Sequence, residues 1–167
     1  LTSSPPPSFA VSNPSLRVIV LLVLSLVAGV AAGTQPAGTG DGDWPLASRD
    51  YEATRFSPLP DINATNAARL TLVSTFSTGV LRGHEGSPLV MNGTMYLHTP
   101  FPNKVFAIDL DTQKIKWRYE PKQDAAVIPQ MCCDTVYRGL AYAENKIFLQ
   151  QADSMLVALD AGTGKVL

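Results

Sequence analysis

The chain of 167 residues is long enough for one domain of ordinary size. Apolar residues make up 46% of it, charged residues 16%, and the formal net charge is −1. Because this balance provides neither a basic face nor an acidic tail, nucleic acids and other polyanions are excluded as expected partners. Aromatic residues with frequent glycine and proline, and few long polar helical patterns, favour β structure.

An apolar run at residues 18–32 follows Arg17 and leads into a stretch of small residues. A basic start, an apolar core and a small-residue exit are typical of a secretory signal peptide, here with cleavage after Ala32. The run is shorter than the roughly 20 apolar residues of a membrane-spanning helix. A retained single-span anchor, which would hold the protein at a membrane, is the alternative. Export would bring the protein into an oxidising compartment.

The expected organisation is a signal-peptide region at 1–32, a flexible linker at 33–43 and one domain at 44–167. In that domain, residues 61–70 predict a short capped turn or helix, with Asn63 or Thr65 as the cap. Asn92-Gly93 is a strong hairpin signal. Short strands are predicted, in chain order, at 72–76, 88–90, 95–98, 104–110, 115–119, 140–143, 147–150 and 155–159.

Residues 105–117 and 156–167 repeat the same pattern of Ala, Asp, Thr and Lys. A spacing of about 50 residues, with several short strands in each unit, is typical of propeller blades. The motif predicts a tight turn between two blade strands, with Trp117 packing between neighbouring blades. Gln113 stands where the second copy has Gly164, so the first turn should either differ or carry strain. Two similar hairpins in an unrelated sandwich are the alternative.

The chain begins with Leu1 and ends at Leu167 inside the second repeat, so we expect a fragment. Its two cysteines, Cys132 and Cys133, are adjacent. A bond between them would be strained, because consecutive Cα atoms lie about 3.8 Å apart and disulfides prefer about 5.5–6 Å. Such a ring would form a stiff, flat, apolar plate that suits a planar cofactor. Two reduced buried cysteines, or bridges to other parts of a longer chain, remain alternatives. With His84 and His98 the cysteines fit no zinc spacing.

Several stretches resemble pyrroloquinoline quinone (PQQ) dependent methanol and ethanol dehydrogenases. Cys132-Cys133-Asp134 followed by Arg138-Gly139 is similar to the segment in which a vicinal disulfide covers the quinone. Stretches at 43–45, 55–59, 76–79 and 83–90, and the blade turns, are also similar, so the resemblance spans 44–167. It implies an all-β fold, the N-terminal part of an eight-bladed β-propeller of the quinoprotein type, incomplete in this chain.

The resemblance also implies roles for four residues. Glu85 matches a carboxylate that hydrogen-bonds the quinone, and the Cys132–Cys133 disulfide matches the ring packed on one face of it. Arg138 matches a basic residue near the cofactor carboxylates, which guanidinium binds well. Without the resemblance, Glu85 would be a surface charge at a hairpin end and Arg138 a solvated arginine at a blade edge. The family's base and its calcium or lanthanide ligands match positions beyond Leu167, so no catalytic or metal-binding residue is assigned.

The function implied is that of a periplasmic enzyme that oxidises a primary alcohol by hydride transfer to the quinone. Electrons would then pass to a periplasmic cytochrome c. A homodimer or a complex with a small subunit is expected, and the fragment alone is expected to be inactive. One alternative is a non-catalytic propeller scaffold for outer-membrane protein assembly, which needs neither Glu85 nor the cysteine pair. Another is a sugar dehydrogenase on the same fold, which the adjacent cysteines disfavour.

Overall fold

A computed structural model describes residues 40–167 of the chain. The predicted signal-peptide region and all but the end of the predicted linker lie outside the described residues. Within 40–167 no helix is long and apolar enough to cross a membrane. The elements are η1 (Ala67–Arg69), β1 (Leu89–Met91), β2 (Thr94–His98), β3 (Val105–Asp109), β4 (Ile115–Tyr119), η2 (Ala125–Gln130), β5 (Ala141–Ala143), β6 (Lys146–Gln150) and β7 (Leu156–Asp160).

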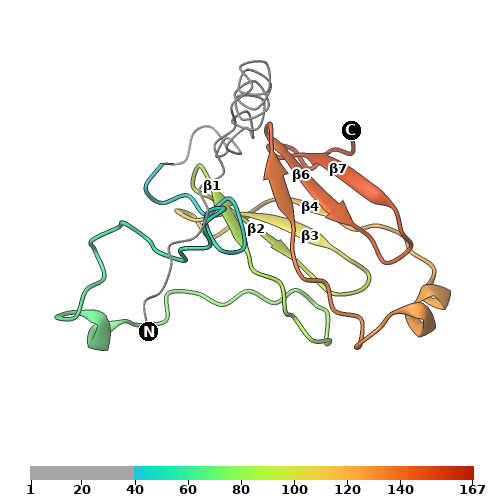
Figure 1. Cartoon of the computed structure of the whole chain (residues 1–167), viewed down its shortest axis with the longest axis horizontal. Coiled ribbons are helices and arrows are strands. Elements are labelled where there is room, and N and C mark those ends of the chain that lie inside the picture. Colours follow the sequence, from blue (N-terminus) through green and yellow to red (C-terminus); the bar gives the residue numbers. More distant parts are fainter. Residues whose placement is uncertain (1–39) are drawn as a thin grey trace, which may run out of the picture. The chain divides into compact units, whose positions relative to one another are not determined.

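The first sheet is an antiparallel meander in the order β1-β2-β3-β4 (Figure 1). Asn92 and Gly93 both have positive φ, 50° and 69°, as a two-residue hairpin turn of the primed type requires. Trp44 forms an antiparallel bridge with Val90, so the chain start of the domain runs along the outer side of β1. The predicted hairpin and the strands on either side of it are confirmed.

The second sheet repeats the same antiparallel order with β5-β6-β7. A bridge between Leu159 and Val166 begins a further pairing on the outer side of β7. All the strands predicted after Pro88 are therefore confirmed, with small differences at their ends. The repeated sequence pattern thus corresponds to two antiparallel sheets, one of four strands and one of three strands with a further bridge.

Apolar side chains from both sheets form one core. Its fully or nearly fully buried members include Leu89, Val105 and Ala107 on the first sheet and Ile147, Leu149 and Leu159 on the second. Alternation places these residues on the facing sides of the two sheets, because successive side chains of a strand point to opposite faces.

Trp117 makes the contact between blades that the repeat predicted. Its indole Nε1 donates to the carbonyl oxygen of Ala161 at 2.9 Å, and the Tyr96 hydroxyl donates to the same oxygen at 3.1 Å. The rings of Tyr96 and Trp117 also lie 5.9 Å apart. Burial raises the pKa of Tyr96 to about 12. Two side chains of the first blade thus hold the turn of the second.

The two blade turns have the same geometry. Asp109 Oδ1 accepts from the amide and the hydroxyl of Thr112, both at 2.8 Å. Asp160 Oδ1 accepts from the amide of Thr163 at 2.8 Å and its hydroxyl at 2.7 Å. These hydrogen bonds lower the pKa of both carboxyls. The predicted aspartate-capped turn is confirmed in both copies.

Because the turns match, the first one carries strain instead of adopting another form. Gln113 has φ of 58° where Gly164 has φ of 71°, and this left-handed region costs a residue with a side chain about 1–2 kcal/mol. Gly164 has a second reason to be glycine: a Cβ there would lie 2.5 Å from Cε3 of Trp117. Gln113 is exposed, so its side chain extends into solvent.

Of the two predictions for residues 61–76, one is wrong and the other is confirmed. The strand expected at 72–76 is not formed, and Leu72 and Val73 are 80% and 78% exposed. A strand needs a hydrogen-bonded neighbour, and no segment among residues 40–167 pairs with this one. At 61–70 the expected short turn and helix form, the helix being η1. Asn66 holds the N-cap position of η1 but makes no side-chain cap hydrogen bond. The Asn63 side chain instead accepts from the amide of Thr65 at 3.0 Å.

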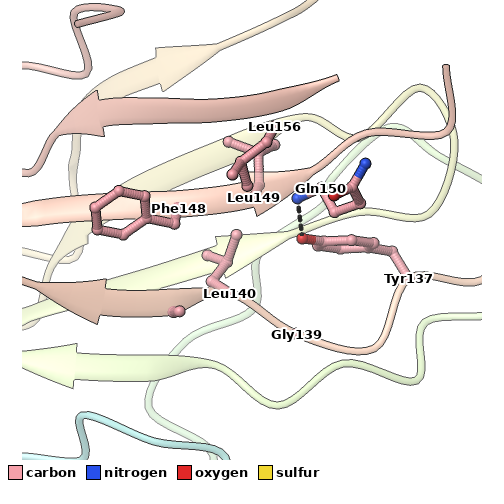
Figure 2. Close-up of a pocket in the computed structure, with 8 residues that line it drawn as sticks. Tyr137, Gly139, Leu140, Phe148, Leu149, Gln150 and Leu156 are labelled. Carbon is pink, nitrogen blue, oxygen red and sulfur yellow. Dashed lines mark hydrogen bonds between the residues drawn. The ribbon is translucent and has the colours of Figure 1, made fainter. Parts of the chain in front are cut away.

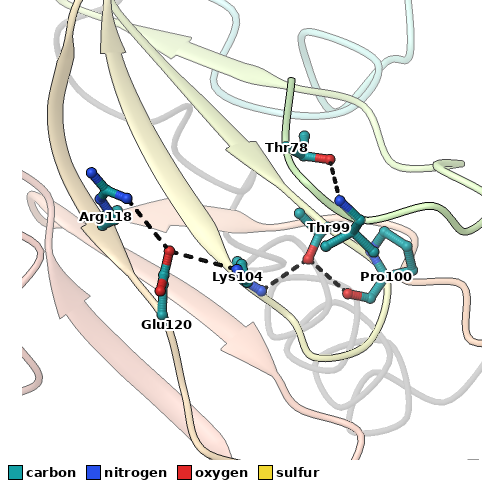
Figure 3. Close-up of polar contacts among 7 residues, drawn as sticks. Thr78, Thr99, Pro100, Lys104, Arg118 and Glu120 are labelled. Atoms are coloured by element: carbon teal, nitrogen blue, oxygen red, sulfur yellow. Dashed lines mark hydrogen bonds and ion pairs between the residues drawn. The ribbon is translucent and has the colours of Figure 1, made fainter. Parts of the chain in front are cut away.

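A polar cluster fixes the end of β2 and the start of β3 (Figure 3). The Thr99 hydroxyl accepts from the amide of Lys104 at 3.0 Å and donates to the carbonyl of Pro100 at 2.7 Å. Glu120 lies 3.6 Å from the Lys104 ammonium and 3.8 Å from the Arg118 guanidinium. The last residue of β2, His98, is therefore held on a well-anchored strand.

Candidate functional site

Two segments far apart in the sequence, 82–87 and 131–139, lie side by side. A parallel bridge joins Ser87 to Gly139. Gly86 packs against the imidazole of His98, so closely that a Cβ would lie 1.9 Å from Nε2. Only glycine fits at this position without a rearrangement. These contacts place the residue that precedes Gly86 near the residue that precedes Gly139.

Those two residues are Glu85 and Arg138, and they form an ion pair. Arg138 Nη1 lies 3.4 Å from Glu85 Oε2, and the side chains are 75% and 49% exposed. An exposed pair of this kind contributes little to stability. It does place a carboxylate beside a guanidinium that has five N–H donors. The structure therefore brings two predicted site residues together, paired with each other.

Cys132 and Cys133 lie at the same place, after η2. Both are free and exposed, so they are neither bonded to each other nor buried in this structure. The predicted disulfide stays a prediction for the oxidised protein. The pKa of the Cys133 thiol is raised, first by a hydrogen bond with Cys132 and then by the charge of Cys132. The charges of Arg138 and Glu85 also act on this thiol, so all four predicted residues share one exposed edge.

Asp134 ties the cysteine turn to the Glu85 segment. Its backbone, like that of Cys133, has φ of 66°, and its Oδ1 lies 3.2 Å from Arg82 Nη1. The pKa of the Asp134 carboxyl is lowered, chiefly by a hydrogen bond from the Thr135 amide, with Arg82 and the Gly83 amide adding to the effect. Asp134 lies within the cysteine motif, but Arg82 lies outside the motifs, and the sequence does not predict this pair.

His98 and Tyr137 lie beneath this edge. His98 is 4% exposed, and its ring meets that of Tyr137 edge-on at 4.9 Å. Its Nε2 lies 3.1 Å from the Tyr137 carbonyl oxygen, and the Tyr137 hydroxyl accepts from the amide of Gln150 at 2.8 Å (Figure 2). The sequence assigns His98 no role, because its spacing with His84 and the cysteines fits no zinc pattern. Its alternation with Thr94 and Tyr96 along β2 was the available signal that it points inward.

A hollow of about 360 Å³ lies beside Tyr137 on the second sheet (Figure 2). Its walls are mostly apolar and include Leu140, Phe148, Leu149 and Leu156. None of the four predicted site residues lines it. Among residues 40–167 no group of three or more His, Cys, Asp and Glu side chains is placed to hold a metal ion.

The residues of the exposed edge fit a flat anionic cofactor. Arg138 and Arg82 supply guanidinium groups that bind carboxylates, and Glu85 supplies a hydrogen-bond acceptor. The adjacent sulfur atoms of Cys132 and Cys133 supply a polarizable surface. These groups converge from two segments at one edge.

Comparison with known proteins gives a consistent result. Residues 44–167 match the family model described as "Glucose/ethanol/alcohol dehydrogenase, beta-propeller domain", named PQQ. A lanthanide-dependent methanol dehydrogenase of Methylorubrum extorquens is 64% identical over 122 residues, covering 72% of this chain and 20% of that protein. Subunit 1 of the methanol dehydrogenase [cytochrome c] of Paracoccus denitrificans is 40% identical over 171 residues, covering 92% and 27%.

The fold is similar to that of a solved europium-containing methanol dehydrogenase, with a TM-score of 0.73 and 49% identity, over 77% of this chain and 23% of the other. The chain thus spans 20% to 27% of the length of these two sequence relatives. The predicted family and the propeller fold class are confirmed. The number of blades, eight, stays a prediction. The chain belongs to the PQQ family of glucose, ethanol and alcohol dehydrogenase β-propeller domains.

Proposed function

We propose that this chain is part of a periplasmic, PQQ-dependent dehydrogenase that oxidises a primary alcohol of the methanol type. The observation that carries the proposal is the Glu85–Arg138 pair, which lies beside Cys132 and Cys133 at one edge. The export implied by residues 18–32 supports the compartment. Relatives named methanol dehydrogenase support the substrate class.

The chemistry of the bound quinone would be the acceptance of a hydride equivalent from the alcohol carbon. The chain's own residues bind and orient the group. Arg138 pairs with a cofactor carboxylate, and Glu85 accepts a hydrogen bond from the ring system. Cys132 and Cys133, joined as a flat ring in the oxidised protein, cover one face and exclude water from it. Burying a charged cofactor among fixed partners strengthens these contacts.

A calcium or lanthanide ion completes the proposed cofactor set. One relative is named lanthanide-dependent and one similar structure is named europium-containing. An alcohol oxidation also needs an electron acceptor. The relative named "Methanol dehydrogenase [cytochrome c] subunit 1" supports a cytochrome c and a further subunit as partners. A homodimer is the other assembly that the proposal allows.

The alternative of a non-catalytic assembly scaffold is not favoured. A scaffold has no use for a glutamate and an arginine converging on adjacent cysteines. The relatives reported above are named dehydrogenases.

The test uses the full-length protein purified from the periplasm. We expect an absorbance band of bound quinone and reduction of cytochrome c that depends on added methanol. The same preparation with glucose in place of methanol is the control, because a sugar dehydrogenase would respond to glucose. A protein that neither contains quinone nor takes up added PQQ with calcium or a lanthanide would contradict the proposal.

A further inference from the structure

One buried histidine contacts both segments that carry the charged residues of the site. His98 ends β2, which is hydrogen-bonded to β1 on one side and β3 on the other. Its ring touches Gly86, the neighbour of Glu85, and its Nε2 reaches the carbonyl of Tyr137, the neighbour of Arg138. The Gly86 and Tyr137 backbones also meet here, since a Cβ on Gly86 would lie 2.9 Å from the Tyr137 oxygen.

The chemistry of this contact defines the state of the ring. A carbonyl oxygen only accepts, so Nε2 carries the proton and donates to Tyr137. Nδ1 is buried and has no hydrogen-bond partner among residues 40–167. A second proton on Nδ1 would place an uncompensated charge in this buried position. Burial accordingly lowers the pKa of His98, which favours the neutral imidazole.

We propose that His98 is a positioning residue of the quinone site. Its neutral ring sets the distance between the Gly86 and Tyr137 backbones, and thereby the distance between Glu85 and Arg138. The ring is rigid and belongs to an inner strand. The segments that carry Glu85 and Arg138 therefore both pack against one fixed side chain. This inference rests on the proposed function, because it assumes that Glu85 and Arg138 hold the quinone.

The test compares variants of the full-length enzyme, stripped of quinone and titrated with PQQ in the presence of calcium and, in a parallel series, of a lanthanide. His98→Leu removes the donor, and we expect PQQ to bind about tenfold to a hundredfold more weakly, as when outer-shell partners of a bound group are lost. His98→Gln keeps an N–H donor at a similar reach, and we expect partial recovery. Because the two charged residues move relative to the quinone, the absorption band of the bound quinone should shift in His98→Leu.

Two further variants separate positioning from general packing. Gly86→Ala keeps His98 but pushes the Glu85 segment off its ring, so it should weaken PQQ binding in the same range. Tyr96→Phe removes a buried side-chain hydrogen bond from the same strand β2, the one to the Ala161 carbonyl oxygen at 3.1 Å, and leaves His98 in place. It should bind PQQ like the wild type. Circular dichroism and the Tm establish that each variant is folded.

Wild-type affinity and an unshifted band in folded His98→Leu and Gly86→Ala would overturn the inference. If His98→Leu does not fold, His98→Gln and Gly86→Ala decide, and wild-type binding by both has the same meaning. An equal loss of PQQ affinity in Tyr96→Phe would show that the general stability of β2 accounts for the effect, and would also overturn the inference. A wild-type enzyme that binds no PQQ contradicts the proposed function itself, which separates the two failures.

Discussion

The matched turns of the two blades allow one position to be tested in opposite directions. Gly164→Ala adds a Cβ to a residue with φ of 71°, at 2.5 Å from Cε3 and 2.6 Å from Cδ2 of Trp117. Gln113→Gly removes a side chain from the equivalent residue, which has φ of 58° and is exposed. Gly164→Ala therefore introduces backbone strain and a steric overlap with the indole of Trp117. Gln113→Gly only relieves backbone strain.

The magnitudes follow from the two local environments. For Gly164→Ala, the left-handed backbone costs about 1–2 kcal/mol and overpacking against the indole about 1–3 kcal/mol. Alanine also lowers the entropy of the unfolded chain, which raises the unfolding free energy by roughly 0.5–1 kcal/mol. The expected loss of unfolding free energy is therefore about 1–4 kcal/mol. For Gln113→Gly the same strain is relieved and the same entropy is lost, so the expected change is a gain of up to about 1 kcal/mol.

The assay is urea unfolding of the full-length protein, followed by tryptophan fluorescence and far-ultraviolet circular dichroism. Coincident transitions by the two probes justify a single unfolding free energy. A neutral Gly164→Ala would refute the close approach of Trp117 to this turn. A Gln113→Gly variant destabilised as much as Gly164→Ala would refute the conclusion that the first turn carries strain.

Three further predictions concern the core and the site. Tyr96→Phe and Trp117→Phe each leave one donor on the shared carbonyl oxygen of Ala161. In urea unfolding, the double variant should therefore lose about 1–2 kcal/mol more unfolding free energy than the sum of the two single variants. Additive losses would contradict this. His98 has a lowered pKa in the folded protein, where burial and the charge of a neighbouring histidine disfavour the proton. Its stabilising contribution is complete above the unfolded pKa of about 6.5 and declines as the pH falls through the folded pKa. The stability of the wild type relative to His98→Gln should therefore fall below about pH 6.5, whereas a pH-independent difference would be evidence against a buried neutral ring. In the full-length protein prepared without reductant, non-reducing peptide mapping should yield one peptide that holds Cys132 and Cys133 and lacks two hydrogens. Two free thiols or a bridge to a third cysteine would exclude the ring.

Local signals predicted the hairpins well. Asn92-Gly93 sets its own turn geometry, because both residues accept positive φ without help from distant parts of the chain. The strand expected at 72–76 failed for the opposite reason. Its β-branched and aromatic residues suit a strand, but pairing depends on a neighbour distant in the sequence. Phe76 instead contacts Phe106 edge-on, with ring centres 5.1 Å apart.

The sequence predicted which residues lie together at the exposed edge, but not how they pair. The resemblance named Glu85 and Arg138, but their mutual ion pair requires two distant segments to meet, as they do at the Ser87–Gly139 bridge, and no local pattern encodes that meeting. The left-handed backbone of Cys133 is likewise a tertiary feature, since a residue with a side chain adopts it only when its surroundings hold it there. For Gln113, sequence reasoning left two outcomes open, and the shared hydrogen bonds of the two turns decided for strain.

The central claim is that Arg138 and Glu85 hold the quinone, and quinone content per purified full-length protein tests it most directly. In Arg138→Ala the Glu85 carboxylate loses its partner and faces an anionic cofactor, so attraction is replaced by repulsion. In Glu85→Gln the guanidinium is freed for the cofactor and the amide keeps an acceptor, so the loss should be small. We expect Arg138→Ala, folded by circular dichroism, to retain far less quinone than Glu85→Gln. Full quinone occupancy in Arg138→Ala would show that this arginine is only a charge at a blade edge, and the site assignment would be wrong.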